Sequence, residues 1–148
     1  AEELQQIRGV LEGLAAELAC ERADDGFVAR LEEANEAFAA AHRSGDHSGM
    51  GEANWRFHRV VLQAADSTQL TVSLEGIWAK CRRFRLGYRL IPGRAANTIE
   101  EHRRIMAAFA ARDAASARLA ICDHVGRASV DLLALLAADE AAAAGPGR

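Results

Sequence analysis

The sequence predicts an all-α protein, an antiparallel bundle of about six helices around a central ligand or metal cavity. Half of the 148 residues are hydrophobic and only two are prolines, while alanine, the strongest helix former, is abundant. Apolar residues recur at three- and four-residue spacing along most of the chain, as expected for helices that bury one face. A single domain of this length can bury a core of its own.

Capping and turn-forming segments separate the expected helices, because aspartate suits a helix N-terminus while serine, glycine and proline interrupt helices. These segments are Asp24-Asp25, Ser44-Gly45-Asp46, Asp66-Ser67, Ile91-Pro92-Gly93 and Arg112-Asp113. The first helix is expected over residues 2–22, and the second, which carries Phe27, Leu31 and Phe38, is expected to end near Arg43. The third ends near Asp66, the fourth runs from there to Tyr88, the fifth covers residues 95–111, and the sixth is long. The helical domain is expected to span residues 1–141, and residues 142–148 to form a disordered tail.

The first helix has an amphipathic pattern. Its polar positions, mainly Glu and Gln, are expected to face solvent. The stripe expected to face the core consists of Leu4, Ile7, Leu11, Leu14 and Leu18.

Four polar side chains lie on stripes that otherwise face the core. Asn54 and His58 are one helical turn apart on one such face, and His102 and His124 lie on apolar stripes of the last two helices. Their apolar neighbours at helical spacing are Phe57, Val61, Leu62, Ala65, Ile105, Met106, Phe109, Ala117, Ile121 and Leu132. The side chains of the four polar residues are therefore expected inside the bundle.

Burial of these groups requires partners. One inward histidine is usually a hydrogen-bonded core residue, but several imidazoles buried without partners would cost on the order of 1–3 kcal/mol each. One shared cation would satisfy His58, His102, His124 and Asn54 together. Three nitrogens and one oxygen suit a divalent transition metal with open positions for a ligand, zinc being favoured and nickel, manganese or iron being alternatives.

Composition argues against several other classes. A formal net charge of −3 gives no basic surface for a nucleic-acid backbone. The cysteines, Cys20, Cys81 and Cys122, are odd in number and far apart, as expected of reduced thiols in a cytoplasmic protein. The sequence has no secretion signal at its start and no apolar run long enough to span a bilayer, so no membrane association is expected.

The order and spacing of several motifs resemble the FCD domain, the effector-sensing domain of many GntR-type bacterial transcription regulators. The motifs are Arg8-x-x-Leu11-Glu12 followed by Ala-Ala-x-Leu-Ala, Asn54-x-x-Phe57-His58, Glu101-His102-x-x-Ile105-x-x-Ala108, Arg112-Asp113-x-x-Ser116-Ala117, and His124. The resemblance implies a bundle of six or seven helices, usually dimeric, that binds a small organic acid and controls a separate winged helix-turn-helix domain. In the metal-binding branch of the family, an Asp or Asn and three histidines hold the cation, which corresponds here to Asn54, His58, His102 and His124.

The sequence departs from the common family pattern in three respects. Asn54 stands where an aspartate is frequent, which should weaken divalent affinity and increase dependence on an anionic ligand. Asp66-Ser67-Thr68 replaces the usual break after the third helix. No winged helix-turn-helix precedes Ala1, so operator DNA would be bound only through a separate domain that this chain does not contain.

Three residues are candidates for effector binding. Arg8 projects from the edge of an apolar stripe, and its guanidinium offers a fork for a carboxylate. A surface pair with Glu12, stabilising by only about 0.2–0.5 kcal/mol, is the other interpretation, and the family resemblance favours effector contact. Thr98 and Tyr88 could add hydroxyl contacts or could only pack.

The sequence therefore predicts a non-enzymatic sensor in which a cation and Arg8 chelate a carboxylate or hydroxycarboxylate and shift the arrangement of a homodimer. A metal-dependent hydrolase is the first alternative. It is disfavoured because an HExxH motif is missing and Glu101 is rotated about 100° from His102 on the helix. A metal-free interaction domain, with its histidines bonded to one another, is the second alternative.

Overall fold

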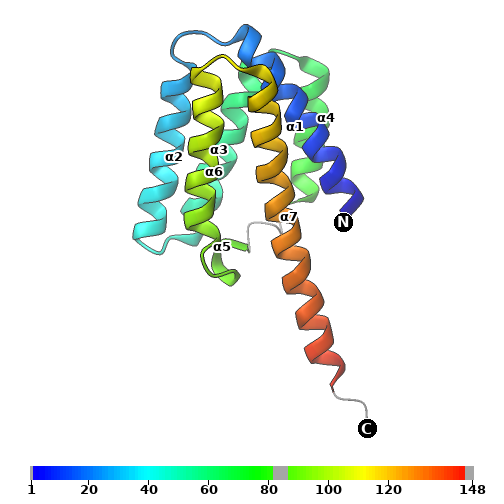
Figure 1. Cartoon of the computed structure of the whole chain (residues 1–148). Helices are drawn as coiled ribbons and strands as arrows, with labels where there is room; N and C mark the ends of the chain where they lie inside the picture. The colour runs from blue at the N-terminus through cyan, green and yellow to red at the C-terminus, as the bar shows by residue number, and fades with distance from the viewer. Residues whose placement is uncertain (1, 82–86, 146–148) are drawn as a thin grey trace.

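Figure 1 shows the computed structural model, which describes residues 2–81 and 87–145, as an all-α bundle. Its helices are α1 (Glu2–Arg22), α2 (Phe27–Arg43), α3 (His47–Ala65), α4 (Thr68–Lys80), α5 (Gly87–Leu90), α6 (Arg94–Ala110) and α7 (Ala114–Ala144). The predicted fold class is confirmed. The first part of α7 packs in the bundle and its second part extends beyond the other helices (Figure 1).

Three of the predicted turn residues form side-chain caps, whereas α2 begins after Gly26 without a side-chain cap from Asp24 or Asp25. The side chains of Asp46, Ser67 and Asp113 accept hydrogen bonds from backbone N–H groups of the first turns of α3, α4 and α7. Asp66 and Arg112, at the ends of two helices, have positive φ values of 47° and 52°. Such left-handed residues reverse the chain within a few positions, so consecutive helices run antiparallel.

The fourth predicted helix ran to Tyr88, whereas α4 ends at Lys80 and Tyr88 lies on the separate short helix α5. Residues 82–86 between them, including Phe84 on which that prediction partly rested, lie outside the described residues. At the other end of the chain, α7 continues to Ala144, past the expected boundary at residue 141. Within residues 2–81 and 87–145, no helix is long and apolar enough to cross a membrane.

The predicted inner face of α1 is wrong. Ile7 and Leu14 are 46% and 40% exposed, and Leu4, Leu11 and Leu18 are only partly buried. The residues that α1 buries are instead Gln5, Glu12, Gly13, Ala15, Ala16, Ala19 and Cys20. Small residues occupy this face because α1 lies close to α7, and the larger leucines remain at its sides.

Gly13 marks the closest approach of the two helices. A Cβ atom there would lie 2.8 Å from Cys122 Sγ and 3.2 Å from Arg118 Cγ on α7. Cys122 also donates a hydrogen bond to the Gly9 carbonyl at 3.3 Å. This contact fixes the position of α1, and therefore of Glu12, next to the centre of the bundle.

Candidate metal centre and ligand pocket

The histidines of three different helices converge at the centre of the bundle. His58 of α3, His102 of α6 and His124 of α7 are 4%, 0% and 3% exposed. One ring nitrogen from each lies within 4.8 Å of the others. His58 Nε2 and His124 Nε2 are 3.1 Å apart.

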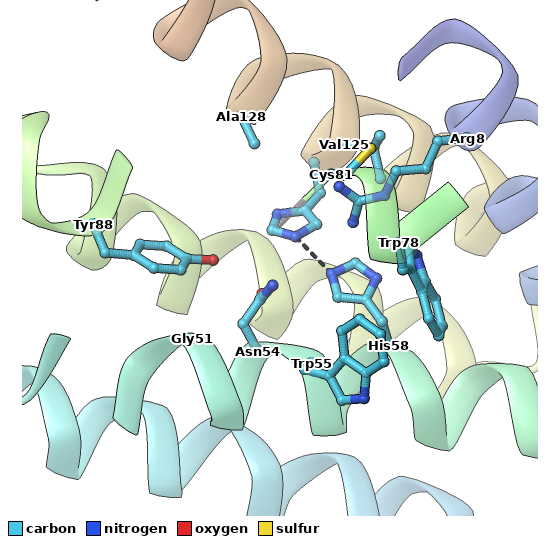
Figure 2. Close-up of a pocket in the computed structure, with 11 residues that line it drawn as sticks. Arg8, Gly51, Asn54, Trp55, His58, Trp78, Cys81, Tyr88, Val125 and Ala128 are labelled. Atoms are coloured by element: carbon cyan, nitrogen blue, oxygen red, sulfur yellow. Dashed lines mark hydrogen bonds between the residues drawn. The ribbon is translucent and has the colours of Figure 1, made fainter. Parts of the chain in front are cut away.

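Asn54 completes the predicted set. Its Oδ1 atom lies 3.1 Å from His102 Nε2, and its side chain projects from α3 into the same space (Figure 2). The four residues that the sequence predicted as ligands therefore meet at one place, and three of them contribute Nε2 atoms there.

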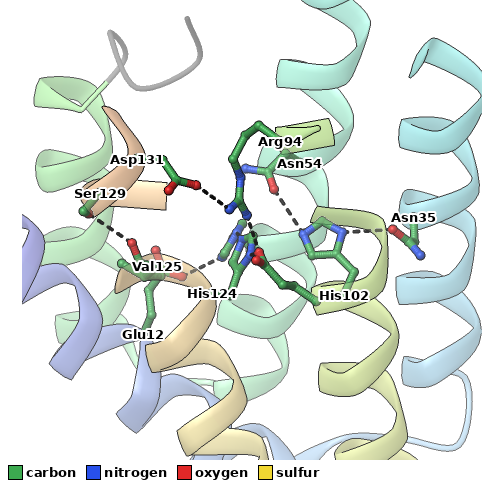
Figure 3. A network of polar contacts seen from close by, with 11 residues as sticks. Glu12, Asn35, Asn54, Arg94, His102, His124, Val125, Ser129 and Asp131 are labelled. Carbon is green, nitrogen blue, oxygen red and sulfur yellow. Dashed lines mark hydrogen bonds and ion pairs between the residues drawn. The ribbon is translucent and has the colours of Figure 1, made fainter. Parts of the chain in front are cut away.

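Each histidine has an outer partner on its other ring nitrogen, which the sequence analysis missed. Glu12 Oε2 lies 2.6 Å from His58 Nδ1, and Glu101 Oε2 lies 2.7 Å from His124 Nδ1. Asn35 Oδ1 lies 3.0 Å from His102 Nδ1. Figure 3 shows His102 between Asn35 and Asn54. Such partners are typical of histidines that bind metals, because they fix the ring and its tautomer.

These outer partners determine where the protons are. A carboxylate oxygen can only accept, so His58 and His124, when neutral, each carry the proton on Nδ1 and the lone pair on Nε2. His58 and His124 then face each other with two lone pairs. Turning either ring would break its bond to a carboxylate, so the contact is satisfied by a positive charge between the rings, either a metal ion or an added proton.

His102 faces Asn54 in a similar way, with a nitrogen lone pair opposite an amide oxygen. Here a rotation of the Asn54 amide would place its NH₂ group toward His102 and form an ordinary hydrogen bond. The His58–His124 contact is therefore the stronger indication of a cation.

The charge states of the histidines suit metal binding. Burial holds the pKa of His102 well below its usual value, and His124, His58 and Arg94 add to the shift. Burial also lowers the pKa of His124 to about 4, against the opposing effect of its bond to Glu101. Both rings are therefore neutral near pH ~7, the form in which imidazole binds a cation.

Both buried glutamates are ionised and paired with arginines. Burial opposes ionisation of Glu12, but Arg8 and His58 hold its pKa well below the usual value. Burial likewise opposes ionisation of Glu101, whose pKa is lowered by its contacts with His124 and Arg94. The two glutamate charges are thus offset by the two arginines beside them.

Arg8 and Arg94 occupy different positions around this centre. Arg8 Nε donates to Glu12 Oε1 at 2.7 Å, so the pair that was the alternative interpretation of Arg8 exists but is largely buried. Arg94 donates to Glu101 and, at 3.1 Å, to Asp131 on α7. Arg94 thereby links the start of α6 to α7, near the point where α7 leaves the bundle (Figures 1 and 3).

A cavity of about 60 Å³ opens beside the histidines. Of the three predicted effector-binding residues, Arg8 and Tyr88 line it, whereas Thr98 is fully buried and is not among the lining residues. The cavity is also lined by Asn54, His58, Trp78, Cys81, His124 and Val125. Figure 2 shows the Tyr88 hydroxyl directed toward Asn54, and burial raises the pKa of Tyr88 to about 12. Tyr88 can therefore donate a hydrogen bond to a ligand at neutral pH.

No carboxylate among the described residues of this centre is placed to act as a general base. Glu12 and Glu101 each accept from a histidine and an arginine, so their basic oxygens are already occupied. The arrangement can coordinate a cation and bind an anion, which is the chemistry of a binding site.

Comparisons with known proteins agree with the fold and with the motifs. The FCD domain family matches residues 3–127. The solved structure of Escherichia coli McbR/YncC has a TM-score of 0.82 and 24% identity, covering 90% of this chain and 67% of that one. Streptococcus agalactiae GntR has a TM-score of 0.69 and 23% identity, covering 88% of this chain and 57% of that one. This chain thus spans 67% of the length of McbR/YncC and 57% of the length of GntR. It matches no curated protein.

Proposed function

Because the chain belongs to the FCD domain family, the effector-binding domains of GntR-type transcription regulators, we propose that it senses a small carboxylate or hydroxycarboxylate with the help of a divalent metal. Members of this family regulate transcription and are not enzymes. The geometry and the charges of the site support the metal, the effector and the response that we propose.

The His58–His124 contact is the main support for the metal. The two Nε2 atoms are 3.1 Å apart, and the Nδ1 atom of each ring is bonded to a carboxylate. The residues that would hold the cation are His58, His102 and His124 through Nε2, and Asn54 through Oδ1. Zinc, nickel, manganese and iron are all compatible with this set, with zinc favoured by its three imidazoles. When bound, the cation would offer open positions to oxygen atoms of a ligand.

The charges around the site favour an anionic effector. None of the four candidate ligands supplies a negative charge. The network around them has three carboxylates, Glu12, Glu101 and Asp131, and two guanidinium groups, Arg8 and Arg94. A divalent cation would bring two positive charges, and this network would offset only part of them. A carboxylate would offset part of this charge, and Arg8, which uses Nε for Glu12, still has its terminal nitrogens for a second contact.

The size of the cavity favours a small effector. The space beside the histidines is about 60 Å³ and is partly open to the surface, so it suits a small acid better than a bulky one. Tyr88 would donate its hydroxyl to one of the ligand oxygens.

The response would be a shift between two arrangements of a cytoplasmic homodimer, with operator DNA bound by a separate winged helix-turn-helix domain. The exposed apolar side chains of α1 and α7, namely Ile7, Val10, Leu14, Leu119 and Val130, support a second copy packed against these adjacent helices. Differential affinity of the effector for the two arrangements would change the affinity for the operator.

Elemental analysis of the purified protein, paired with native mass spectrometry, tests the proposal. The expected result is about one transition metal per chain in the wild type, loss of that metal in His102→Ala, and co-purification or binding of a small acid. An absence of metal after incubation with zinc, nickel and manganese would overturn the four-ligand site. A metal bound equally well by His102→Ala would show that it binds elsewhere.

A further inference from the structure

We propose that Glu12 is a positioning residue that fixes the tautomer of His58, so that the Nε2 lone pair of this ring faces the other candidate ligands. The purpose of this arrangement rests on the proposed metal site, but the arrangement itself can be tested without metal. Glu12 lies in the middle of α1 and is 2% exposed.

All the partners of Glu12 that the structure describes are donors. Its Oε1 atom accepts from Arg8 Nε and from Trp78 Nε1, both at 2.7 Å. Arginine and tryptophan side chains have no acceptor on these nitrogens, so Oε1 cannot carry a proton toward them. Oε2 lies 2.6 Å from His58 Nδ1 and, as a carboxylate oxygen, can only accept a hydrogen bond from its N–H group. The ring is thereby held with hydrogen on Nδ1 and none on Nε2.

The packing of the α1 backbone also constrains Glu12. The adjacent residue, Gly13, lies where α1 touches α7, with room for no Cβ atom at normal distance from Cys122. Rotation or translation of α1 would break this contact. The carboxylate is therefore presented to α3, which carries His58, from a fixed distance.

Glu12 differs from the other two outer partners. Glu101 is bonded to His124 and Arg94, and Asn35 supplies only an amide oxygen to His102. Glu12 alone among these three contacts Arg8, a residue that lines the ligand cavity. One carboxylate thus orients a candidate metal ligand and a candidate anion-binding residue together.

Substitution of Glu12 by glutamine keeps the shape of the side chain and changes the group that faces His58, so it tests the effect on the His58 tautomer alone. In Glu12→Gln, the amide oxygen would remain with Arg8 and Trp78, because both are donors. The NH₂ group would then point at His58 Nδ1 and donate to it, which moves the ring proton to Nε2. That proton would point at His124 Nε2 and form a hydrogen bond where a cation would otherwise bind.

Nitrogen-15 NMR of the metal-free protein measures this tautomer directly. Long-range ¹⁵N–¹H correlation spectra would be recorded at a pH of about 8, where imidazoles are neutral, with His58→Ala used to assign the signals. We expect hydrogen on Nδ1 of His58 in the wild type and on Nε2 in Glu12→Gln. Glu17→Gln, which removes a partly exposed carboxylate from the same helix, should resemble the wild type. A wild-type ring protonated on Nε2, or an unchanged ring in Glu12→Gln, would overturn the proposal.

Zinc affinity, measured by competition with a chromophoric chelator, gives the second readout. Loss of an outer partner commonly lowers metal affinity about 10–100-fold, and Glu12→Gln should fall in this range while Glu17→Gln remains at the wild-type value. Equal affinity of Glu12→Gln and wild type would contradict the role of Glu12 toward the metal. If the wild type binds no zinc, the proposed metal site fails, and the NMR result still decides whether Glu12 fixes the tautomer.

A second pair of variants covers the case in which Glu12→Gln does not fold, since it leaves Arg8 without a negative partner. Arg8→Gln and the double variant Arg8→Gln/Glu12→Gln differ only at residue 12 and contain no unpaired guanidinium. The change of His58 from Nδ1–H to Nε2–H between these two proteins is the expected result. The same tautomer in both would overturn the proposal.

Discussion

His58 and His124 bring their Nε2 atoms to 3.1 Å from each other, while the Nδ1 atom of each ring is bonded to a glutamate. When both rings are neutral, this places two lone pairs in contact at the centre of the bundle. The contact is unfavourable without a cation and favourable with one. The stability of the protein should therefore respond to metal, to pH and to the charge of the ligand set.

Added metal should stabilise the wild type and should not stabilise His102→Ala. A ligand that binds only the folded state at 100 times its dissociation constant raises the free energy of unfolding by about 2.7 kcal/mol. His102→Ala also loses a stacked contact with Phe57, so each protein is compared with itself by thermal unfolding with zinc and with chelator. His42→Ala, which changes an exposed histidine, serves as the control and should keep the full response. A zinc response of His102→Ala equal to that of the wild type would contradict the site.

Stability of the metal-free protein should decrease as the solution is acidified below pH ~6.5. The pKa of His124 is about 4 in the folded protein, below the ordinary value of 6.5, and the pKa of His102 is also lowered. Between the folded and unfolded pKa values the unfolded chain binds more protons, so each such histidine removes about 1.4 kcal/mol per pH unit as the pH falls. Urea unfolding in chelator between pH ~7 and ~5 measures the slope. A flat profile, or one that His124→Gln leaves as steep, would be inconsistent with these pKa shifts.

Asn54→Asp should strengthen metal binding and reduce its dependence on an anion. A carboxylate at this position adds one negative charge to a ligand set that has none, and even at an effective dielectric constant of about 20 such a charge gives more than tenfold in affinity, or about 1.4 kcal/mol. Calorimetric titration with zinc, with and without acetate, measures both effects. Asn97→Asp makes the same charge change at an exposed position of α6 and should have little effect. Weaker zinc binding by Asn54→Asp would argue against Asn54 as a ligand.

Gly13→Ala should destabilise the bundle, although alanine is the better helix former. The added methyl group would overlap Cys122 Sγ at 2.8 Å, and overpacking of about 1–3 kcal/mol exceeds the roughly 1 kcal/mol gained in helix propensity. Gly76→Ala on α4, where no atom lies within 4 Å, should instead stabilise by about 0.5–1 kcal/mol. Urea unfolding compares the two variants. Truncation of Cys122 to alanine in the Gly13→Ala protein should restore part of the loss.

Several features of the fold and site could be predicted because they depend on helical periodicity. The histidines at positions 58, 102 and 124 recur on apolar stripes, and a residue on such a stripe must face another helix. Turn residues such as Asp66 and Arg112 gave the helix boundaries to within a few positions. Periodicity thus predicts that the three histidines point into the bundle, and the structure shows that they also lie at the same level along it.

The outer partners could not be predicted by the same reasoning, because periodicity gives the direction of a side chain and not its partner. Helical geometry rotates Glu101 away from His102, and the same rotation turns it toward α7 and His124. The leucine stripe of α1 predicts that Glu12 faces solvent, whereas the opposite face of the helix is the buried one. The small residues Ala15, Ala16 and Ala19, which share helical spacing with Glu12, were the signal that this face was inside.

The packing of α1 against α7 has a consequence for the kinetics of folding. Glu12 and His124 belong to the first and last helices of the bundle, so the centre is complete only when distant parts of the chain have come together. Joining distant helices costs loop-closure entropy before their contacts stabilise the chain, so we expect the contacts of this centre to be weakly formed in the transition state for folding. A bound ion would then slow the unfolding reaction and leave the refolding rate nearly unchanged. The ion would thus stabilise the folded bundle and would not stabilise the transition state for its formation.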